Sequence, residues 1–425
     1  MSSAASTCRA PSNIAVIKYW GKRDAGALNL PLNSSLSLTL DVADMCAKTT
    51  AVLSEAFAED KLWLNGEEVE VNKRVATVLR EVRARAATAA AEGEALRAPP
   101  TAGARMVSVN NFPTAAGLAS SAAGYACMVA TLEAAWGLPP RPSGTPGDST
   151  AIARMGSGSA CRSLFGGFVR WDCGTRADGV DSVATQVAPA AHWPDIDVTI
   201  LVLNAGKKAV SSTSGMQTTC RTSPLLAHRA ANVVPARLLE MEAAIAARDF
   251  AKFATLTMRD SNQFHATCLD TYPPIFYLND ASRRVIHVVH ALNDHAAAAA
   301  EAGAASSAEE EASASDNGAV GKPIAAYTFD AGPNAVIFTE RARTAEVRDV
   351  LGFYFPPPSD DDAATSAGSV PSTGSFVPSP ELSARVGFGV QAGLTQRVIV
   401  TRVGPGPEVL PESEALADAA TGMPL

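Results

Sequence analysis

The stretch NNFPTAAGLASSAAG, residues 110–124, joins an expected strand to an expected helix. Its small side chains allow a ligand close to the backbone, and the following helix directs free N–H groups and its positive dipole end toward the loop. These features favour a phosphate ligand, with the hydroxyls of Ser120 and Ser121 as contacts to phosphate or Mg²⁺. The loop is not a Walker A loop, because no Gly-Lys-Ser/Thr follows at the required spacing. A packed turn without a ligand has the same composition, so both interpretations stay open.

Outside this stretch, β-rich and helical segments follow one another without a regular order. Runs of β-branched and aromatic residues predict strands, and apolar residues three and four apart predict helices. The irregular order favours α+β layers over a doubly wound sheet. The expected strands are Leu36 to Leu40, Met106 to Val109, Phe168 to Trp171, Val198 to Leu203, Tyr327 to Phe329, Asn334 to Phe338 and Arg397 to Thr401, and the expected helices are Val75 to Ala91, Ala119 to Trp136, Ser223 to Asp249, Phe250 to His265 and Arg283 to His290.

Two stretches of low complexity interrupt these elements. Residues 295–317 are dominated by Ala, Glu and Ser, and residues 356–378 are rich in Pro, Ser, Asp and Gly. Both lack the large apolar residues of a packed core, so we expect surface excursions. The first stretch has an alternative, which is to extend a helix by several turns, because Ala and Glu favour the helical state.

Composition narrows the class of protein. The 425 residues suffice for two or three domains without a disulfide or metal to stabilise them. A net charge of −8 argues against a general nucleic-acid binder or a polybasic membrane-surface protein, so local cations must meet an anionic ligand. The seven cysteines lack paired or metal-ligand spacing, which fits a reducing compartment. Neither membrane spanning nor export is expected, because long apolar runs and an apolar leader segment are absent.

Two segments supply candidate cations. Residues 156–163 place Arg162 among small and hydroxyl side chains, and a guanidinium can bind a carboxylate or phosphate through two parallel hydrogen bonds. Lys18, Lys22 and Arg23 form a positive cluster beside two aromatic residues. A lone arginine and a charge cluster are also typical of a solvated surface, so this alternative stays open for both.

Two polar segments complete the candidates. Residues 211–216 form a hydroxyl-rich turn after the basic pair Lys207 and Lys208, and such turns are often plain loops. Asp330 follows an expected strand and precedes the tight turn at residues 331–333. An aspartate there commonly forms the turn through its own side chain, and a catalytic carboxylate is the alternative.

Together these segments resemble the mevalonate diphosphate decarboxylases over nearly the whole chain. Residues 113–122 are similar to the phosphate-loop signature of the superfamily of galactokinase, homoserine kinase, mevalonate kinase and phosphomevalonate kinase, and they identify the superfamily only. The resemblance to the decarboxylases rests on segments in family order: KYWGKR at 18–23, GSGSACR at 156–162, SSTSGM at 211–216, DSNQFH at 260–265, YPP at 272–274 and FDAGPNA at 329–335.

This resemblance implies the α+β, two-domain GHMP kinase fold. A ribosomal-S5-like ATP-binding domain is expected over residues 1–210 and a ferredoxin-like domain over residues 211–425, with the substrate cleft between them. The implied reaction is the ATP-dependent decarboxylation of mevalonate 5-diphosphate to isopentenyl diphosphate, with release of ADP, phosphate and CO₂. This is the last step of the mevalonate route to isoprenoids and sterols. The implied cofactors are ATP and Mg²⁺.

The resemblance also implies roles for single residues. Asp330 is expected to face the C3 hydroxyl and accept its proton, and Arg162 is expected to hold the substrate carboxylate with help from Ser159. Where this chain has Thr213, bacterial relatives often carry arginine, and Lys207 and Lys208 are the candidates to replace that contact. The remaining implied positions are Lys18 and Ser212 for catalysis, Tyr19, Lys22, Ser157, Met216 and Ala331 for the substrate, Lys18, Asn110, Gly117, Leu118, Ala119, Ser120 and Ser121 for ATP, and Ser120 and Ser121 for Mg²⁺.

Three other functions share parts of this pattern. A kinase that stops after phosphoryl transfer has the same phosphate loop, but Asp330 together with Arg162 argues against it. A decarboxylase that prefers a monophosphate is discriminated only weakly. A nucleotide-binding sensor without activity is disfavoured, because Lys18, Arg162, Ser212 and Asp330 are all present. The resemblance further implies small-molecule partners, a homodimer and a cytoplasmic location, with neither a nucleic-acid nor a membrane partner.

Overall fold

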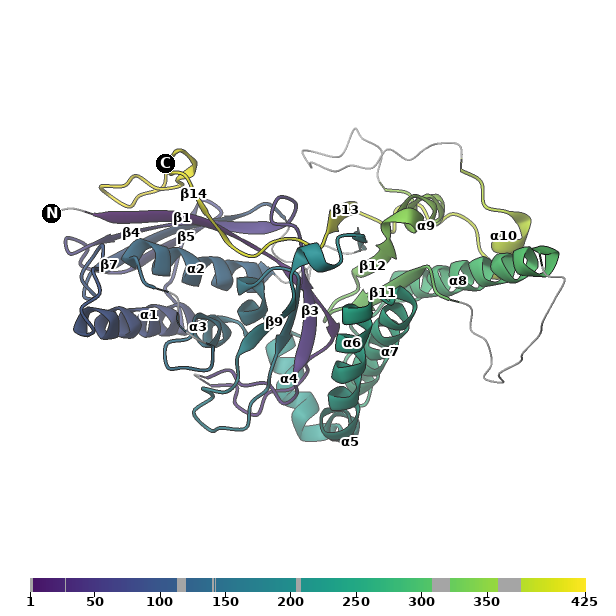
Figure 1. The fold of residues 1–425 in the computed structure, drawn as a ribbon, viewed down its shortest axis with the longest axis horizontal. Helices are drawn as coiled ribbons and strands as arrows, with labels where there is room; N and C mark the ends of the chain where they lie inside the picture. Colours follow the sequence, from purple (N-terminus) through teal and green to yellow (C-terminus); the bar gives the residue numbers. More distant parts are fainter. Residues whose placement is uncertain are drawn as a thin grey trace.

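The structure is a computed structural model that describes residues 3–26, 28–112, 120–139, 141, 143–203, 208–307, 322–357 and 376–425. Three sheets follow one another along the longest axis of the molecule, with helices packed against them (Figure 1). The architecture is α+β, as the irregular order of the segments predicts.

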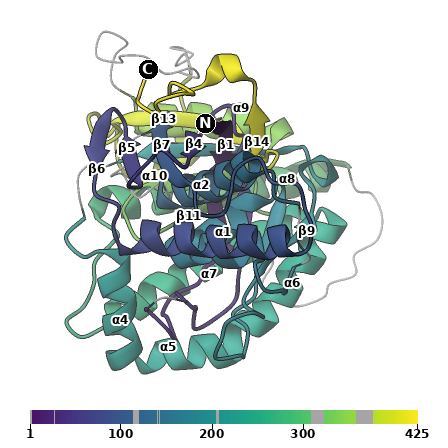
Figure 2. The ribbon, with the colours of Figure 1, turned by 90° about the vertical axis from the view of Figure 1, so that its left-hand side faces the viewer.

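The first sheet has six strands in the order β14-β1-β4-β7-β5-β6. Neighbours are antiparallel except β5 and β7, which are parallel. The helix α2 packs on β1 and β4 with α1 beside it (Figure 2), and α3 packs against both helices. The bounds are β1 (Ala4–Pro11), β4 (Cys46–Ser54), β5 (Lys61–Leu64), β6 (Glu67–Val69), β7 (Gly103–Asn110), β14 (Glu408–Leu410), α1 (Lys73–Ala91), α2 (Ser120–Trp136) and α3 (Ser149–Gly156).

The second sheet has four antiparallel strands in the order β2-β3-β8-β9. It contacts α6 and the 3₁₀ helix Gly158–Leu164, so every residue of β2 and β3 is buried. The bounds are β2 (Asn13–Ile17), β3 (Ser35–Thr39), β8 (Phe168–Trp171), β9 (Ala184–Ala188) and α6 (Val234–Ala247).

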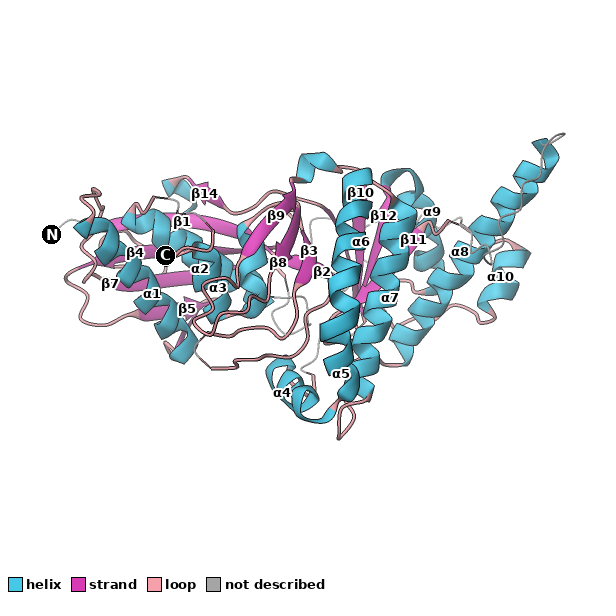
Figure 3. Cartoon of the chain, turned by 60° about the horizontal axis from the view of Figure 1, so that its bottom comes forward, coloured by secondary structure: helices cyan, strands magenta, loops and turns pink. Residues whose placement is uncertain are grey.

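The third sheet has four antiparallel strands in the order β11-β12-β10-β13. The helices α7 and α8 pack on its edge strand β11, and α9 packs on β10 and β12 (Figure 3). The bounds are β10 (Ile196–Val202), β11 (Ala325–Phe329), β12 (Ala335–Glu340), β13 (Arg397–Arg402), α7 (Phe250–Leu269), α8 (Asp280–Ser307), α9 (Arg341–Tyr354) and α10 (Pro380–Val386).

The helix expected over Ser223 to Asp249 is confirmed, with a π-helical turn inside it and a further short helix before it. The structure has α4 (Ser212–Thr222), α5 (Pro224–His228), a π-helical turn over Arg229–Val233, and then α6. Arg248 is left-handed with φ 55° and ends α6, and the Asp249 carboxylate accepts the Lys252 N–H and begins α7. The expected helix boundary at Phe250 is therefore confirmed, because a left-handed residue and a capping carboxylate separate the two helices.

The sequence missed several strands whose composition favours sheets only weakly. Strand β1, with the sequence AASTCRAP, consists mainly of small and polar residues, yet it pairs with β4 on one side and β14 on the other. Its conformation follows from these neighbours rather than from intrinsic propensity. The stretch at 295–317 extends α8 as far as Ser307, which was the alternative to a loop. Residues 308–321 and 358–375 lie outside the described residues.

The predicted domain division at residue 210 does not coincide with a division between the sheets. Strand β10 precedes it but pairs with β12 and β13, which follow it. The late strand β14 returns to pair with β1 in the first sheet. The domain limits stay a prediction. Within the described ranges, none of the helices combines the length and the apolar character that crossing a bilayer would need.

We expect Phe253→Ala to lower the free energy of unfolding by about 3–5 kcal/mol, since a buried aromatic ring leaves a cavity when it is removed. Phe253 is fully buried, and its ring contacts Trp193 and Phe338 with centroids at 5.7 and 5.6 Å. Urea unfolding measures the change. The control Leu239→Ala removes a side chain that is 66% exposed on α6 and should change stability by less than about 0.5 kcal/mol. Equal losses in the two variants would contradict the assigned core.

Candidate active site

A cavity of ≈ 350 Å³ opens where the second and third sheets approach each other. Its lining residues come from the chain after β2 and β11, from the first turns of α1, α2 and α4, and from the 3₁₀ helix Gly158–Leu164. Its lining is mostly polar and contains five cationic side chains. The lining residues are Asn13, Ala15, Lys18, Tyr19, Trp20, Lys22, Asn29, Arg74, Ser120, Ser121, Ser157, Gly158, Ser159, Arg162, Lys208, Ser211, Ser212, Thr213, Met216, Phe264, Asp330 and Ala331.

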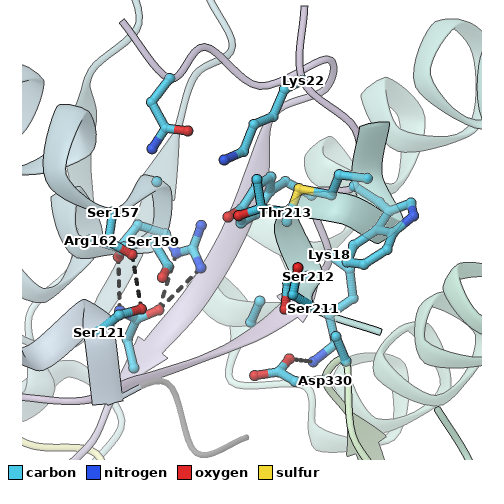
Figure 4. Close-up of a pocket in the computed structure, with 18 of the residues that line it drawn as sticks. Lys18, Lys22, Ser121, Ser157, Ser159, Arg162, Ser211, Ser212, Thr213 and Asp330 are labelled. Atoms are coloured by element: carbon cyan, nitrogen blue, oxygen red, sulfur yellow. Dashed lines mark hydrogen bonds and ion pairs between the residues drawn. The ribbon is translucent and has the colours of Figure 1, made fainter. Parts of the chain in front are cut away.

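One wall of the cavity carries an ion pair between Lys18 and Asp330. Each residue directly follows a strand, β2 and β11 respectively, and Lys18 Nζ lies 2.5 Å from Asp330 Oδ1 (Figure 4). The side chain of Lys18 is 4% exposed and that of Asp330 is 31% exposed. Burial lowers the pKa of Lys18, and the Asp330 charge opposes that effect. The carboxylate is therefore the partner that remains accessible to a ligand.

The facing wall carries Arg162, which is only 2% exposed. Within the described part of the chain its hydrogen-bond partners are neutral: Asn13 Oδ1 at 3.1 and 3.2 Å, Ser37 Oγ at 2.9 Å and Ser35 Oγ at 2.7 Å. These contacts use three of the five N–H groups of the guanidinium. Burial lowers the pKa of Arg162. A buried cation without an opposite charge is costly, so this arrangement favours an anionic ligand.

Two aromatic rings flank Arg162. Its guanidinium carbon lies 5.7 Å from the ring centroids of both Tyr19 and Trp171, a distance at which a ring attracts a cation. Burial raises the pKa of Tyr19 to about 12, so its hydroxyl stays protonated at neutral pH. The surface interpretation of Arg162 is thus wrong, because the residue is enclosed by rings and by polar groups of the second sheet.

The cationic cluster expected at Lys18, Lys22 and Arg23 is divided in the structure. Lys18 and Lys22 line the cavity, whereas Arg23 donates to the carbonyl oxygens of Cys173 and Arg176 at 3.0 and 2.9 Å. Burial, and secondarily the charge of a nearby arginine, lowers the pKa of Lys22 to about 8. Lys18 and Lys22 therefore place their charges at the cavity, whereas Arg23 stabilises the neighbouring loop that contains Cys173 and Arg176.

Arg74 is a cation of the site that sequence reasoning missed. It lies in the first turn of α1, where the Asn72 side chain accepts its N–H, and its Nη2 donates to Thr213 Oγ1 at 3.3 Å. Lys208 instead donates to Ser212 Oγ and to the Ala331 carbonyl oxygen, both at 2.9 Å. Arg74 thus brings a further cation beside Thr213, and Lys207, one of the two lysines expected to replace the diphosphate contact, lies outside the described residues. No local pattern marks Arg74, because 139 residues separate it from Thr213.

The hydroxyl-rich segment at 211–216 is the beginning of α4 and not a plain loop. Ser211 is the capping residue, and its hydroxyl accepts the Ser214 N–H at 3.1 Å. Ser212, Thr213 and Met216 all lie in the first turns of this 11-residue helix. The positive end of the helix dipole therefore points at the cavity, and this end attracts anions.

The first turn of α2 also reaches the cavity. Ser120 and Ser121 begin α2, and Ser121 Oγ lies 3.0 Å from Ser157 Oγ. Asn13 is a second residue of the site that sequence reasoning missed. Its side-chain N–H donates to the Ser159 carbonyl oxygen at 3.0 Å, and its Oδ1 accepts from the guanidinium of Arg162. The serines that begin α2, the 3₁₀ helix and Asn13 of β2 therefore form one polar wall.

Four of the expected nucleotide contacts are not placed in the cavity. Gly117, Leu118 and Ala119 lie outside the described residues. Asn110 ends β7 in the first sheet, where its N–H donates to Asn65 Oδ1 at 3.0 Å, and it is not among the cavity residues. These four assignments stay predictions.

The donor set of the cavity fits a magnesium ion only together with a bound phosphate. Among the described residues, no group of three or more His, Cys, Asp or Glu side chains could hold a metal ion. Magnesium commonly keeps several waters and uses one or two protein oxygens together with substrate phosphates. Asp330, Ser120 and Ser121 offer such oxygens in this cavity.

Two family models cover most of the chain. Residues 10–184 match the diphosphomevalonate decarboxylase-like N-terminal domain, and residues 198–305 and 312–410 match the mevalonate 5-diphosphate decarboxylase C-terminal domain. The first match ends before β10 and the second begins within it, in keeping with the place of β10 in the third sheet.

Individual relatives agree over nearly the full length. A diphosphomevalonate decarboxylase from Homo sapiens is 48% identical and aligns over 99% of this chain and 97% of its own. The solved mevalonate diphosphate decarboxylase from Trypanosoma brucei has a TM-score of 0.80 at 35% identity, covering 97% and 100%. A solved complex of MDDEF with MVAPP, AMPPCP and magnesium has a TM-score of 0.65 at 29% identity, covering 96% and 99%. The chain therefore belongs to the mevalonate 5-diphosphate decarboxylase family.

Proposed function

We propose that this cavity carries out the ATP-dependent decarboxylation of mevalonate 5-diphosphate to isopentenyl diphosphate, ADP, phosphate and CO₂. Membership of the family supports the reaction. One structural observation supports its assignment to this cavity. A buried guanidinium with only neutral partners faces the Lys18–Asp330 ion pair across the cavity, as a substrate with a carboxylate beside a reacting alcohol requires.

In the first step, we assign Asp330 to orient the tertiary C3 hydroxyl and accept its proton while the hydroxyl oxygen bonds to the γ-phosphorus of ATP. The bond from that phosphorus to the bridging oxygen breaks, and ADP leaves. Lys18 supports this role, because its ammonium group, 2.5 Å away, fixes the direction of the carboxylate. Positioning of this kind supplies much of the rate enhancement in phosphoryl transfer.

In the second step, the C3–O bond breaks and the electron pair leaves with phosphate. The bond between the carboxylate carbon and C2 then breaks, its electron pair forms the double bond between C2 and C3, and CO₂ departs. Arg162 holds the carboxylate in line before this step. Lys22, Arg74 and the first turn of α4 are the groups we assign to the diphosphate, because they bring positive charge to the same side of the cavity.

Nucleotide and metal assignments follow the phosphate loop. We assign the end of that loop, with Ser120 and Ser121, to the ATP phosphates and Mg²⁺, and Lys18 and Ser212 to the region where the γ-phosphate meets the substrate. AMPPCP and magnesium in the solved MDDEF complex support this choice. When bound, the ion supplies charge neutralisation to the phosphates.

Location and assembly are further proposals. A cytoplasmic enzyme is supported by seven free cysteines, since disulfides are rare in reducing compartments. A homodimer is supported only by the family resemblance. The substrate is small, and the net charge of −8 gives no support to nucleic acid as a partner.

The function is tested by incubating the protein with magnesium-ATP and mevalonate 5-diphosphate and measuring ADP and CO₂ together. We expect equal amounts from the wild type, whereas ADP alone indicates a kinase. Faster turnover of the 5-monophosphate indicates a decarboxylase that prefers a monophosphate substrate.

Asp330→Asn should lower kcat by about 10²–10⁴-fold, the usual contribution of a general base, with nucleotide affinity nearly unchanged. Asp280→Asn, which alters a side chain that is 85% exposed, is the control and should match the wild type. Full activity of Asp330→Asn would remove the assigned base.

We expect Arg162→Gln to weaken binding of mevalonate 5-diphosphate by roughly 30-fold or more, since the loss of a buried partner to a carboxylate costs at least about 2 kcal/mol. Titration calorimetry measures this affinity. An analogue that lacks the carboxylate is the matched control, and its affinity should fall less than about threefold. Equal losses for both ligands would contradict the assigned carboxylate contact.

We expect kcat/KM for mevalonate 5-diphosphate to fall as the pH rises through about 8, because Lys22 loses its charge there in the free enzyme. The loss should reach about tenfold, since a hydrogen bond from a charged donor contributes about 1.5–3 kcal/mol. Lys22→Arg stays charged and should remove this alkaline limb. A limb that persists unchanged in Lys22→Arg would exclude Lys22 as its source.

A further inference from the structure

The helix α7 contacts both strands whose ends supply the ion pair of the cavity, β2 and β11. These strands lie in different sheets and are far apart in sequence. From α7, Phe264 lines the cavity, but Asp260 and Ser261 are not among the lining residues, so a ligand in the cavity does not explain why the helix buries these two polar side chains. Two consecutive residues, Asp260 and Ser261, are 0% and 1% exposed there.

Asp260 and its partner Arg229 together hold the backbone N–H and the carbonyl oxygen of Lys18. Asp260 Oδ2 accepts the Lys18 N–H at 2.7 Å. The same carboxylate accepts two N–H groups of Arg229 at 2.8 Å each, and Arg229 Nη2 in turn donates to the Lys18 carbonyl oxygen at 2.9 Å. Arg237 adds a contact of 3.0 Å, and Asn33 donates to the same carbonyl oxygen at 3.0 Å. The backbone of Lys18 is therefore fixed by a largely buried network of one carboxylate, two guanidinium groups and the Asn33 amide.

Ser261 holds the other half of the pair. Its hydroxyl accepts the N–H of Phe329 at 3.1 Å, one residue before Asp330. Since β11 is an edge strand of the third sheet, this N–H has no strand neighbour on that side. Consecutive residues of a helix point about 100° apart, so Asp260 and Ser261 can reach two different strands from one turn.

We propose that Asp260 and Ser261 are positioning residues of the reaction, which set the ends of β2 and β11 in the register that brings Lys18 Nζ to Asp330. The proposal rests on the assigned role of Asp330 as the base. The two residues touch no substrate; they act through the backbone of the residues that do. A shift of either strand end of about 1 Å would misalign the carboxylate with the C3 hydroxyl, and misplacement of that size can cost about 10²-fold in rate.

The variant Ser261→Ala tests this proposal with little risk to the fold, because it removes one hydroxyl and adds no atoms. Thr257→Val is the matched control, since Thr257 lies on α7, is fully buried, and has a hydroxyl without a hydrogen-bond partner among the described residues. We expect kcat of Ser261→Ala to fall about 10- to 100-fold, with both KM values within about twofold of the wild type. Thr257→Val should keep the wild-type kcat. Urea unfolding establishes that both variants are folded at the assay temperature.

A crystal structure of Ser261→Ala gives a second readout that needs no activity. We expect Lys18 Nζ and Asp330 Oδ1 to move beyond hydrogen-bonding distance, about 3.2 Å. A wild-type kcat in Ser261→Ala, or an equal loss in Thr257→Val, would overturn the proposal while leaving the proposed function intact. If the wild type itself releases no CO₂, the proposed function fails. The crystal structure then still decides, because an ion pair retained at 2.5 Å in the variant overturns the positioning role.

Discussion

The site depends on one contact between two sheets, the ion pair of Lys18 and Asp330. Each partner sits at the first position beyond a buried strand, so its backbone is fixed by the strand before it. The pair exists only because helices α6 and α7 pack the second sheet against the third. A small displacement of either sheet would separate the carboxylate from the ammonium group, and the chemistry would lose its base.

The electrostatics of the cavity follow from enclosing cations in an acidic protein. The chain has a net charge of −8, yet five cationic side chains line one cavity. Burial lowers the pKa values of Lys18, Lys22, Arg162 and Lys208, which shows that desolvation opposes their charges. An anionic substrate offsets that cost when it enters. The desolvation of these cations therefore destabilises the free protein, and an anionic substrate gains binding free energy when it supplies the missing opposite charge.

The sequence was sufficient for the fold class, for most strands rich in β-branched residues, and for the pairing of Arg162 with Asp330 in one site. The placing of Arg162 and Asp330 in one site came from the family resemblance, because no spacing rule connects residues so far apart in the chain. The sequence did not identify Arg74 and Asn13 as site residues, because their roles depend on which distant elements fold beside them. Strand β1 was missed for a similar reason, since its small residues become a strand through the neighbours that pair with it. Tertiary packing decides such positions and local patterns do not.

Strand β14 has a consequence for biosynthesis. Arg9 in β1 and Glu408 in β14 form an ion pair although 399 positions separate them, so β1 can pair with β14 only after the ribosome has made the residues between them. Until translation reaches β14, one side of β1 has unpaired N–H and C=O groups, which can form hydrogen bonds with strands of other chains. The nascent amino-terminal half is therefore expected to depend on a chaperone for longer than its own length would suggest.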